Sequence, residues 1–264
     1  MNTTVLNGLK TILLYFLCIC SVAVHAQSLS GKVKTIVIDA GHGGEDSGAS
    51  GAYSKEKNVA LKIALGLGKA IKKELPDVKV IYTRTTDVYV KLYDRIGIAN
   101  NAKADLFISI HCNSLPYKTP GRSSYRGAET LVSGFNRLNE QDVAIRENAS
   151  ILLEKDYKDN YGGYDPKDPE SIIILSLMKN QFRKQSLALA TYIQDQFKAA
   201  GRIDRGVREQ SLAVLARAGM PAVLTEIGYI SSTEEEDYLN SEKGQEEVIS
   251  NLLNGIKAYK LQAE

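Results

Sequence analysis

A chain of 264 residues with 33 basic and 31 acidic side chains has a formal net charge of only +2. This length suits one substantial α/β domain, and the even balance of charge argues against a nucleic-acid binder, which would carry a concentrated basic face. The three cysteines include no Cys-x-x-Cys pair, so a metal ion would have to be held by histidine and carboxylate side chains.

Residues 1–26 have the organisation of a secretory signal peptide. A positive charge at Lys10 precedes a short apolar core at residues 11–24, and Ala26 completes the small-residue pattern that a signal peptidase reads. The apolar run is shorter than the roughly 20 residues of a membrane span. We therefore expect an exported mature chain, residues 27–264, that has no integral membrane span and acts in the periplasm or cell envelope. A retained N-terminal anchor is the alternative.

Buried strands and amphipathic helices alternate along the mature sequence. Strands are predicted at residues 32–40, 78–83, 105–111, 127–132, 211–216 and 222–226, and helices at residues 54–75, 92–101, 137–156, 170–199 and 233–261. This alternation predicts an α/β fold: a single domain with a mostly parallel, mixed, twisted sheet that carries helices on both faces. The block 136–190 departs from the alternation, because two helices there flank the polar, turn-rich stretch 158–169. We interpret it as a helical insertion.

Only two histidines remain after removal of the signal peptide, and each lies at the end of a predicted strand. His42 follows the strand 32–40 within Gly-His-Gly-Gly, and His111 closes the strand 105–111. The carboxyl ends of parallel strands meet at one edge of a sheet, and adjacent strands lie about 5 Å apart, so both imidazoles can reach one ion bound at about 2 Å. Histidine is the commonest zinc ligand, and a catalytic zinc has three protein ligands and one open position.

The third ligand of such a site has to be a carboxylate. The candidates near the glycine-rich loop are Glu45, Asp46 and Glu56. Glu56 lies on the first turn of the helix 54–75, where the helix dipole favours a negative charge, and this complementarity alone would also explain it. Asp39, just before the glycines, either orients an imidazole or caps the loop.

Glu226 is unusual because it interrupts the apolar run 221–230. Glutamate is rarely buried without a partner or a task. At the carboxyl end of its strand it is placed to accept a proton from metal-bound water. The alternative is an ion pair with Arg95 or Arg217. The two histidines at matching strand ends favour the catalytic role.

These segments resemble the zinc-dependent N-acetylmuramoyl-L-alanine amidases of bacterial cell walls, the Amidase_3 type. The resemblance covers about residues 33–260 and is carried by an ordered set of motifs: Ile38–Gly44 with Asp46 and Gly48, Lys55–Asn58, Thr83–Thr85 with Asp87, Leu92, Arg95, Ala99 and Asn100, Ser109–Ser114, and Met220–Ser231.

The resemblance implies zinc held by His42, Glu56 and His111, with Glu226 as the catalytic carboxylate. It also implies peptidoglycan as the substrate, cleaved at the amide bond between N-acetylmuramic acid and L-alanine, in cell-wall remodelling and cell separation. The sequence departs from the family at Cys112-Asn113-Ser114, where Ala-Asn-Ala is more frequent. Neighbours on a strand face opposite sides, so Cys112 is predicted to point away from the metal as a small buried hydrophobe.

In division-associated members of this family, the block that corresponds to residues 136–190 can carry a helix over the active site. Glu140, Glu147 and Glu154 recur at a seven-residue spacing on the predicted helix 137–156. A carboxylate from this row would occupy the fourth zinc position and keep the enzyme off, and a periplasmic activator protein would then be expected to displace it. A row of glutamates on a helix is usually a solvated face, and for any one of these three residues that interpretation is the stronger one.

Other classes of function fit the sequence less well. It contains no Gly-x-Ser-x-Gly, and a dyad of His111 with Cys112 is excluded because adjacent strand residues diverge. Two alternatives are another zinc-dependent hydrolase of cell-wall peptides or glycans and a catalytically silent wall-binding or regulatory module. The intact set of candidate ligands argues against the silent module. Four arginines either serve an acidic peptide stem or pair with Asp87 and Asp94: Arg84, Arg95, Arg208 and Arg217.

Overall fold

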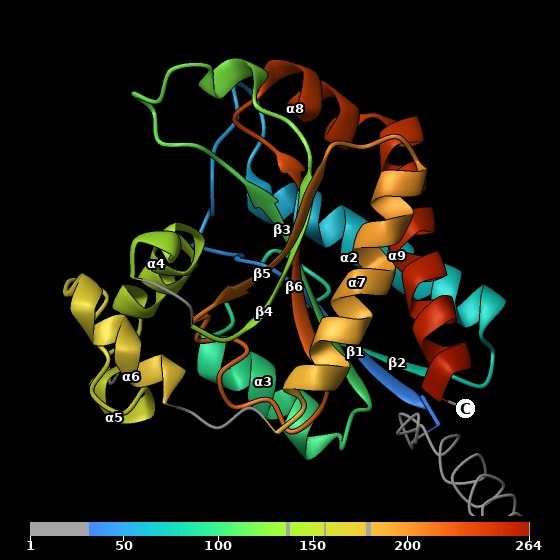
Figure 1. The fold of residues 1–264 in the computed structure, drawn as a ribbon, viewed down its shortest axis with the longest axis horizontal. Coiled ribbons are helices and arrows are strands. Elements are labelled where there is room, and N and C mark those ends of the chain that lie inside the picture. Colours follow the sequence, from blue (N-terminus) through green and yellow to red (C-terminus); the bar gives the residue numbers. More distant parts are fainter. Residues whose placement is uncertain (1–31, 136–137, 156, 178–180, 264) are drawn as a thin grey trace, which may run out of the picture.

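The computed structural model describes residues 32–135, 138–155, 157–177 and 181–263, so the predicted signal peptide lies outside the described residues. Six strands form one mixed sheet in the order β2-β1-β3-β6-β4-β5 (Figure 1). Their bounds are β1 Thr35–Ala40, β2 Lys79–Tyr82, β3 Leu106–Asn113, β4 Ala128–Ser133, β5 Asp204–Gln210 and β6 Ala222–Tyr229. The pair β4 and β6 is antiparallel, and the other four pairs of neighbouring strands are parallel. The predicted single α/β domain with a mostly parallel mixed sheet is confirmed.

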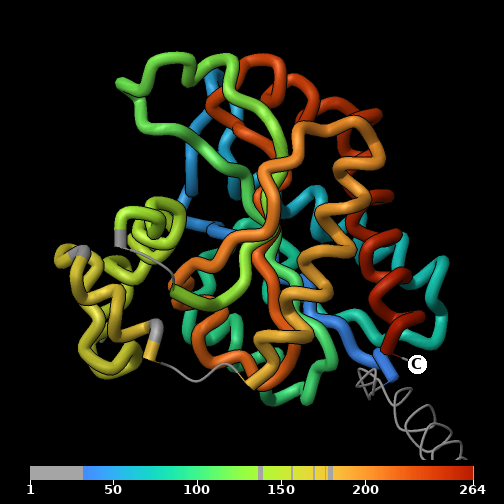
Figure 2. The backbone as a smooth tube through the Cα atoms, viewed as in Figure 1, coloured from blue at the N-terminus to red at the C-terminus, as the bar shows by residue number. Residues whose placement is uncertain are grey.

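Helices cover both faces of the sheet. One face carries α2 (Glu56–Glu74), α7 (Arg183–Ala199) and α9 (Glu242–Ala263), with α8 (Thr233–Asn240) leading into α9 (Figures 1 and 2). The other face carries α3 (Leu92–Asn101), the loop after β5 and the short helices of the insertion. Because strand side chains alternate between faces, Ile36 and Ile38 join the first core cluster, whereas Val37 joins the second.

Helix α2 shows how the sequence specifies these elements. Its apolar positions recur every three or four residues, and Val59, Ile63, Leu67 and Ile71 are all fully buried. The first turn is acidic at Glu56 and the last turn is basic, as the helix dipole favours. The helix therefore presents a carboxylate where the chain leaves the loop that follows β1.

Residues 138–155 and 157–177 form short helices at one side of the domain, coloured lime to yellow in Figure 2. They are η2 Leu138–Glu140, α4 Asp142–Asn148, η3 Ala149–Leu153, α5 Tyr157–Asn160, η4 Pro169–Ser171 and α6 Ile172–Ser176. Glu154 fastens them to the domain, because its Oε1 accepts hydrogen bonds from the Leu92 backbone at the start of α3 and from the Tyr161 hydroxyl. The last part of the predicted block, residues 183–190, lies in α7, which packs on β4 and β5.

Some predicted elements were wrong. The strand at 211–216 is a buried turn that packs into the second cluster, and the edge strand is instead the charged segment β5 just before it. The helix predicted at 137–156 is broken into short pieces, and that at 170–199 into α6 and α7. The helix at 233–261 breaks at Ser241, whose hydroxyl accepts the Gly244 N–H at 3.0 Å and caps α9. Across the described residues no helix combines the length and apolar character that a bilayer span requires.

Candidate metal centre

The loop after β1 holds His42 in an uncommon backbone conformation. His42 has a φ of +59°, a left-handed value that non-glycine residues rarely adopt. Two buried arginines fix the loop by donating to its carbonyl groups: Arg95 Nη2 to His42 O at 2.7 Å, and Arg84 Nη2 and Nε to Gly41 O at 2.7 Å and Ala40 O at 2.9 Å. These hydrogen bonds offset the local strain, so the guanidinium groups position the imidazole through its backbone.

Asp39 balances the charge of this arrangement. Its carboxylate accepts hydrogen bonds from Arg95 Nη1 at 2.8 Å, Ser109 Oγ at 2.6 Å and Thr83 Oγ1 at 2.6 Å. Burial would raise the pKa of Asp39, but Arg95 and the two hydroxyls outweigh it and hold the pKa below its ordinary value. Asp39 therefore supports His42 indirectly, by anchoring Arg95.

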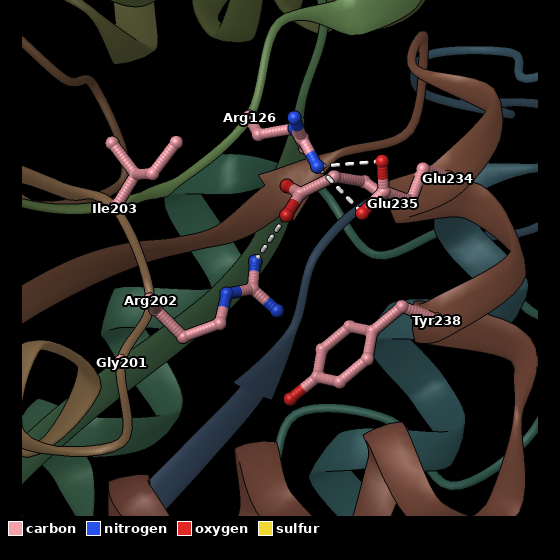
Figure 3. Close-up of a pocket in the computed structure, with 7 residues that line it drawn as sticks. All are labelled: Arg126, Gly201, Arg202, Ile203, Glu234, Glu235 and Tyr238. Carbon is pink, nitrogen blue, oxygen red and sulfur yellow. Dashed lines mark hydrogen bonds and ion pairs between the residues drawn. The ribbon is translucent and has the colours of Figure 1, made fainter.

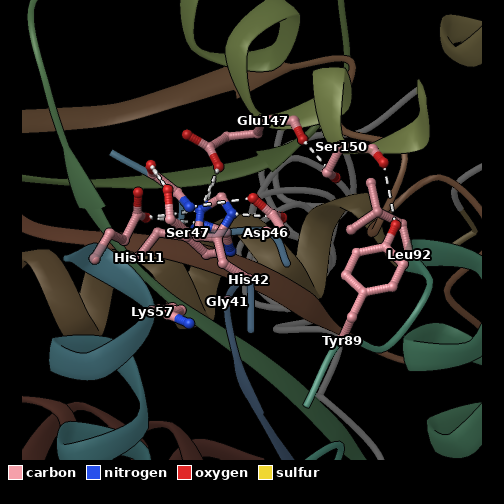
Figure 4. A network of polar contacts seen from close by, with 12 residues as sticks. Gly41, His42, Asp46, Ser47, Lys57, Tyr89, Leu92, His111, Glu147 and Ser150 are labelled. Carbon is pink, nitrogen blue, oxygen red and sulfur yellow. Dashed lines mark hydrogen bonds and ion pairs between the residues drawn. The ribbon is translucent and has the colours of Figure 1, made fainter. Parts of the chain in front are cut away.

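Four buried side chains converge where β1, β3 and α2 meet. Ligand atoms of His42, Glu56, His111 and Glu147 all lie within 4.8 Å of one another. Glu56 Oε1 lies 3.0 Å from His42 Nε2 and 3.1 Å from His111 Nδ1. Glu147 Oε2 lies 3.2 Å and 3.0 Å from the same two nitrogens (Figure 4). The sequence prediction that His42, Glu56 and His111 lie together agrees with this geometry.

The cluster has the donor chemistry of a divalent metal site. Two imidazole nitrogens and two carboxylate oxygens are ligands that suit zinc. His42 Nε2 and Glu147 Oε2 are buried and have no hydrogen-bond partner among the described residues, although they face the same small space. Burial lowers the pKa of His111, but Glu147 and Glu56 raise it to about 9, which reflects the pull of the carboxylates on any positive charge. A cation at this point would satisfy the orphaned atoms and the carboxylates together.

Neighbouring residues orient the cluster. Asp46, one of the alternatives for the third ligand, instead accepts a hydrogen bond from His42 Nδ1 at 2.8 Å, which leaves Nε2 facing the other three side chains. Glu56 accepts the backbone N–H groups of Ala49 at 2.7 Å and Cys112 at 2.9 Å. Glu45 lies on the wall of the adjoining cavity of about 400 Å³.

Close backbone approach requires glycine at Gly41. A Cβ at this position would come within 2.5 Å of the His111 ring, so no larger residue fits beneath the imidazole. Cys112 points to the opposite side of β3 and packs in the first core cluster, as predicted. Burial raises the pKa of its thiol far above the ordinary value, and the side chain behaves as a small hydrophobe.

Glu226 lies beside the cluster and is fully buried. Its backbone is in register with His111 across β3 and β6, so both side chains project from the same face of the sheet. Burial and Glu147 raise the pKa of Glu226 well above its ordinary value, whereas Arg146 opposes the shift. Its ion-pair partner is Arg146, whose Nη2 lies 3.1 Å from Oε1, and neither of the arginines weighed from the sequence takes this place.

Helix α4 lies over the site and engages it with two consecutive residues. Arg146 donates to Glu226, to Glu147 Oε1 at 2.9 Å and to the Ser114 carbonyl at 3.0 Å. Of the three glutamates at seven-residue spacing, Glu147 alone joins the cluster, because the break in the predicted helix sends the other two elsewhere. Glu154 binds the start of α3, and Glu140 offers its backbone carbonyl to Arg208.

A second cavity of about 200 Å³ lies between the start of β5 and α8 (Figure 3). Its charged groups satisfy one another: Arg202 Nη2 donates to Glu235 Oε1 at 2.8 Å, and Arg126 pairs with Glu234. Glu235 also accepts the Tyr229 N–H at 2.7 Å, so this network fastens the end of β6 to α8. We assign it a structural role.

A mixed sheet that gathers two histidines and two glutamates near its strand ends defines an α/β protein with a buried site suited to a divalent metal. The chain belongs to the Amidase_3 family, described as N-acetylmuramoyl-L-alanine amidase, whose model matches residues 36–258. The family resemblance predicted from the sequence motifs is confirmed.

Individual relatives agree with this assignment. The chain is 33% identical over 236 residues to N-acetylmuramoyl-L-alanine amidase AmiC of Escherichia coli O6:H1, an alignment that covers 87% of this chain and 54% of AmiC. It is 30% identical over 240 residues to AmiA of E. coli K12, with 87% and 77% covered. The chain thus spans about half the length of AmiC.

Solved structures show the same fold. The catalytic domain of the amidase CwlV from Bacillus (Paenibacillus) polymyxa var. colistinus superimposes with a TM-score of 0.63 at 30% identity, covering 88% of this chain and 99% of CwlV. An N-acetylmuramoyl-L-alanine amidase from Clostridium difficile 630 gives a TM-score of 0.64 at 26% identity, with 87% and 97% covered.

Proposed function

We propose that this protein is a zinc-dependent peptidoglycan hydrolase that cleaves the amide bond between N-acetylmuramic acid and the L-alanine of the stem peptide. The observation that carries the proposal is the buried convergence of His42, Glu56 and His111, with Glu226 in register beside them. The names of the relatives supply the substrate and the bond. A cell-wall substrate also supports export of the chain through its N-terminal segment, residues 1–26.

His42, Glu56 and His111 would hold the zinc ion. When bound, zinc polarises the amide carbonyl and lowers the pKa of a coordinated water toward about 7. Asp46 keeps the His42 ring in the orientation that presents Nε2, and Arg95 and Arg84 hold the backbone beneath it.

Glu226 is the group that moves the proton. Its Oε2 is buried and has no hydrogen-bond partner among the described residues, so this oxygen is available to accept the proton of the attacking water. The same carboxyl group then delivers the proton to the departing alanine nitrogen, which leaves as a neutral amine. The hydrophobic burial of the strand around Glu226 keeps bulk water from competing for this proton.

Helix α4 holds the enzyme in a resting state. Glu147 Oε2 takes the position between the two imidazoles that a fourth zinc ligand would occupy, and Arg146 occupies the other carboxylate oxygen of Glu226. The fourth ligand position is therefore occupied and Glu226 is held in an ion pair through Oε1, so substrate can bind only after α4 moves.

A partner protein in the periplasm is the expected means of moving α4. Among the matching structures, the amidase CwlD from Clostridioides difficile was solved in complex with the GerS lipoprotein, at a TM-score of 0.61 and 26% identity to this chain. A protein with this fold can therefore assemble with a second protein, which supports a role for an activator here.

The test is mass spectrometry of purified peptidoglycan after digestion by the mature protein, with and without a chelator. The expected product is free stem peptide with an N-terminal alanine, formed with zinc and lost on chelation. The variant Glu226→Gln should retain zinc and release almost no peptide. Release of D-alanine alone would identify a carboxypeptidase, release of acetate a deacetylase, and wall binding without any product a silent module. Each of these results contradicts the proposal.

A further inference from the structure

Arg208 differs from the other three arginines that the sequence offered for an acidic substrate. Arg84 and Arg95 are buried and hold loop carbonyls. Arg217 lies against the Tyr93 ring, 5.5 Å from its centroid. It belongs to the loop before β6 and so lies near the amino end of that strand, whereas Glu226 lies toward the carboxyl end. Arg208 is partly exposed and projects from the same face of the sheet as the candidate site.

Polar side chains extend from the candidate site across the sheet toward Arg208. Glu226 on β6 is in register with Glu129 on β4, and Arg208 Nη1 on β5 lies 3.1 Å from Glu129 Oε2. The other oxygen of Glu129 accepts a hydrogen bond from Asn113. Strands lie about 5 Å apart, so β5 is about 10 Å from β6. Glu129 is buried and fixes the guanidinium group on the same face of the sheet as Glu226.

The start of α4 occupies the free side of this guanidinium group. Arg208 Nη2 donates to Asp142 Oδ1 at 3.0 Å and to the Glu140 carbonyl at 3.1 Å. Five residues further along, Glu147 enters the metal cluster. A helix rises about 1.5 Å per residue, so the Cα atoms of Asp142 and Glu147 are about 7.5 Å apart along the helix axis.

The stem peptide offers a similar pair of groups. An acidic residue that follows alanine has a free α-carboxylate when the chain continues through its side chain. An extended chain advances about 3.5 Å per residue, which places this carboxylate about 7 Å from the scissile amide. The planar fork of an arginine binds such a carboxylate in a defined orientation.

We infer that Arg208, positioned by Glu129, binds the free α-carboxylate of the acidic residue that follows alanine in the stem peptide. In the resting form α4 imitates this substrate, with Asp142 on Arg208 and Glu147 beside the two imidazoles. The inference rests on the proposed function and names the substrate feature that the site selects.

The test compares two synthetic N-acetylmuramoyl tripeptides that differ only at the second residue, one with a free α-carboxylate and one with its amide. Both are assayed with an Asp142→Ala/Glu147→Ala protein, in which the two imitating carboxylates are absent. This protein should prefer the free acid by about 10- to 100-fold in kcat/KM, the range of a charge-assisted hydrogen bond, mainly through KM. Adding Arg208→Met should reduce the ratio to about 1, and Glu129→Gln should lower the preference.

Arg217→Met is the matched control and should keep the full preference. Thermal melting confirms that each variant is folded. An equal preference with and without Arg208, or no preference in the parent protein, overturns the assignment of Arg208 alone. If no variant hydrolyses either tripeptide, the proposed function is refuted and this inference with it.

Discussion

Replacing Glu147 by alanine should activate the isolated enzyme. Glu147 is 4% exposed, and its Oε2 lies 3.2 Å and 3.0 Å from the two imidazole nitrogens while Oε1 accepts from Arg146. Truncation of one partner of a buried, hydrogen-bonded charge pair costs about 3 kcal/mol or more. That loss falls on the closed position of α4, and 3 kcal/mol shifts its equilibrium with the open form by roughly a hundredfold. Release of soluble peptide from labelled peptidoglycan should therefore rise by up to about a hundredfold.

Glu140→Ala is the matched control, because Glu140 belongs to the same seven-residue row and engages Arg208 through its backbone carbonyl alone. Its activity should equal that of the unaltered protein. Bound zinc, measured for each protein, separates release of the block from loss of the metal. A folded, zinc-loaded Glu147→Ala protein that is no more active than the unaltered protein would refute the assignment of Glu147 as the blocking ligand.

Three further predictions concern the supports of the site. Arg146→Met should raise basal activity by about tenfold in the same release assay, since it frees one oxygen of Glu226 and weakens the hold of α4, and unchanged activity would contradict the double contact. Arg95→Met should weaken zinc binding by about 10- to 100-fold in a chelator competition, because the His42 backbone loses its restraint, and an unaltered affinity would limit Arg95 to a structural role. Asp39→Asn should lower the free energy of unfolding by about 3 to 5 kcal/mol at pH 7, because it leaves Arg95 buried and unpaired. The folded-state pKa of Asp39 is depressed, so its contribution exists above pH 3.8 and is lost as the pH falls through the folded value, and the two unfolding curves should converge there.

The core of the site was predictable because each ligand candidate carries a local signal. His42 and His111 lie at the ends of short apolar runs rich in β-branched residues, which favour buried strands, and Glu56 opens a helix with a regular apolar face. The topology then brings these ends together, since β1 and β3 are parallel neighbours. A polar residue at the carboxyl end of a buried strand can therefore be recognised as a candidate site residue from the local sequence alone.

The partner of Glu226 had no such signal. Arg146 lies 80 residues away in sequence, and its contact with Glu226 depends on where a short helix docks. The same limit explains the wrong edge strand. Segment 211–216 is apolar because it fills a gap against the insertion, whereas β5 is charged because it lies at an exposed edge and carries Arg208 toward the site. Local hydrophobicity reports burial, and burial does not specify a strand.

The architecture of α4 indicates how a blocked site can still be opened. The helix has seven residues and no side-chain hydrogen bond at its N-cap, and a helix this short is not stable in water by itself. Its fold therefore depends on docking through Arg146, Glu147 and the contacts of Arg208 and Gln210 with its amino end. These contacts are coupled, because loss of any one loosens the backbone that carries the others. A partner that binds the undocked segment has to offset these polar contacts and the burial of Val143 and Ala144 in the second core cluster, and release would then expose the proposed metal ligands, Glu226 and Arg208 in a single step.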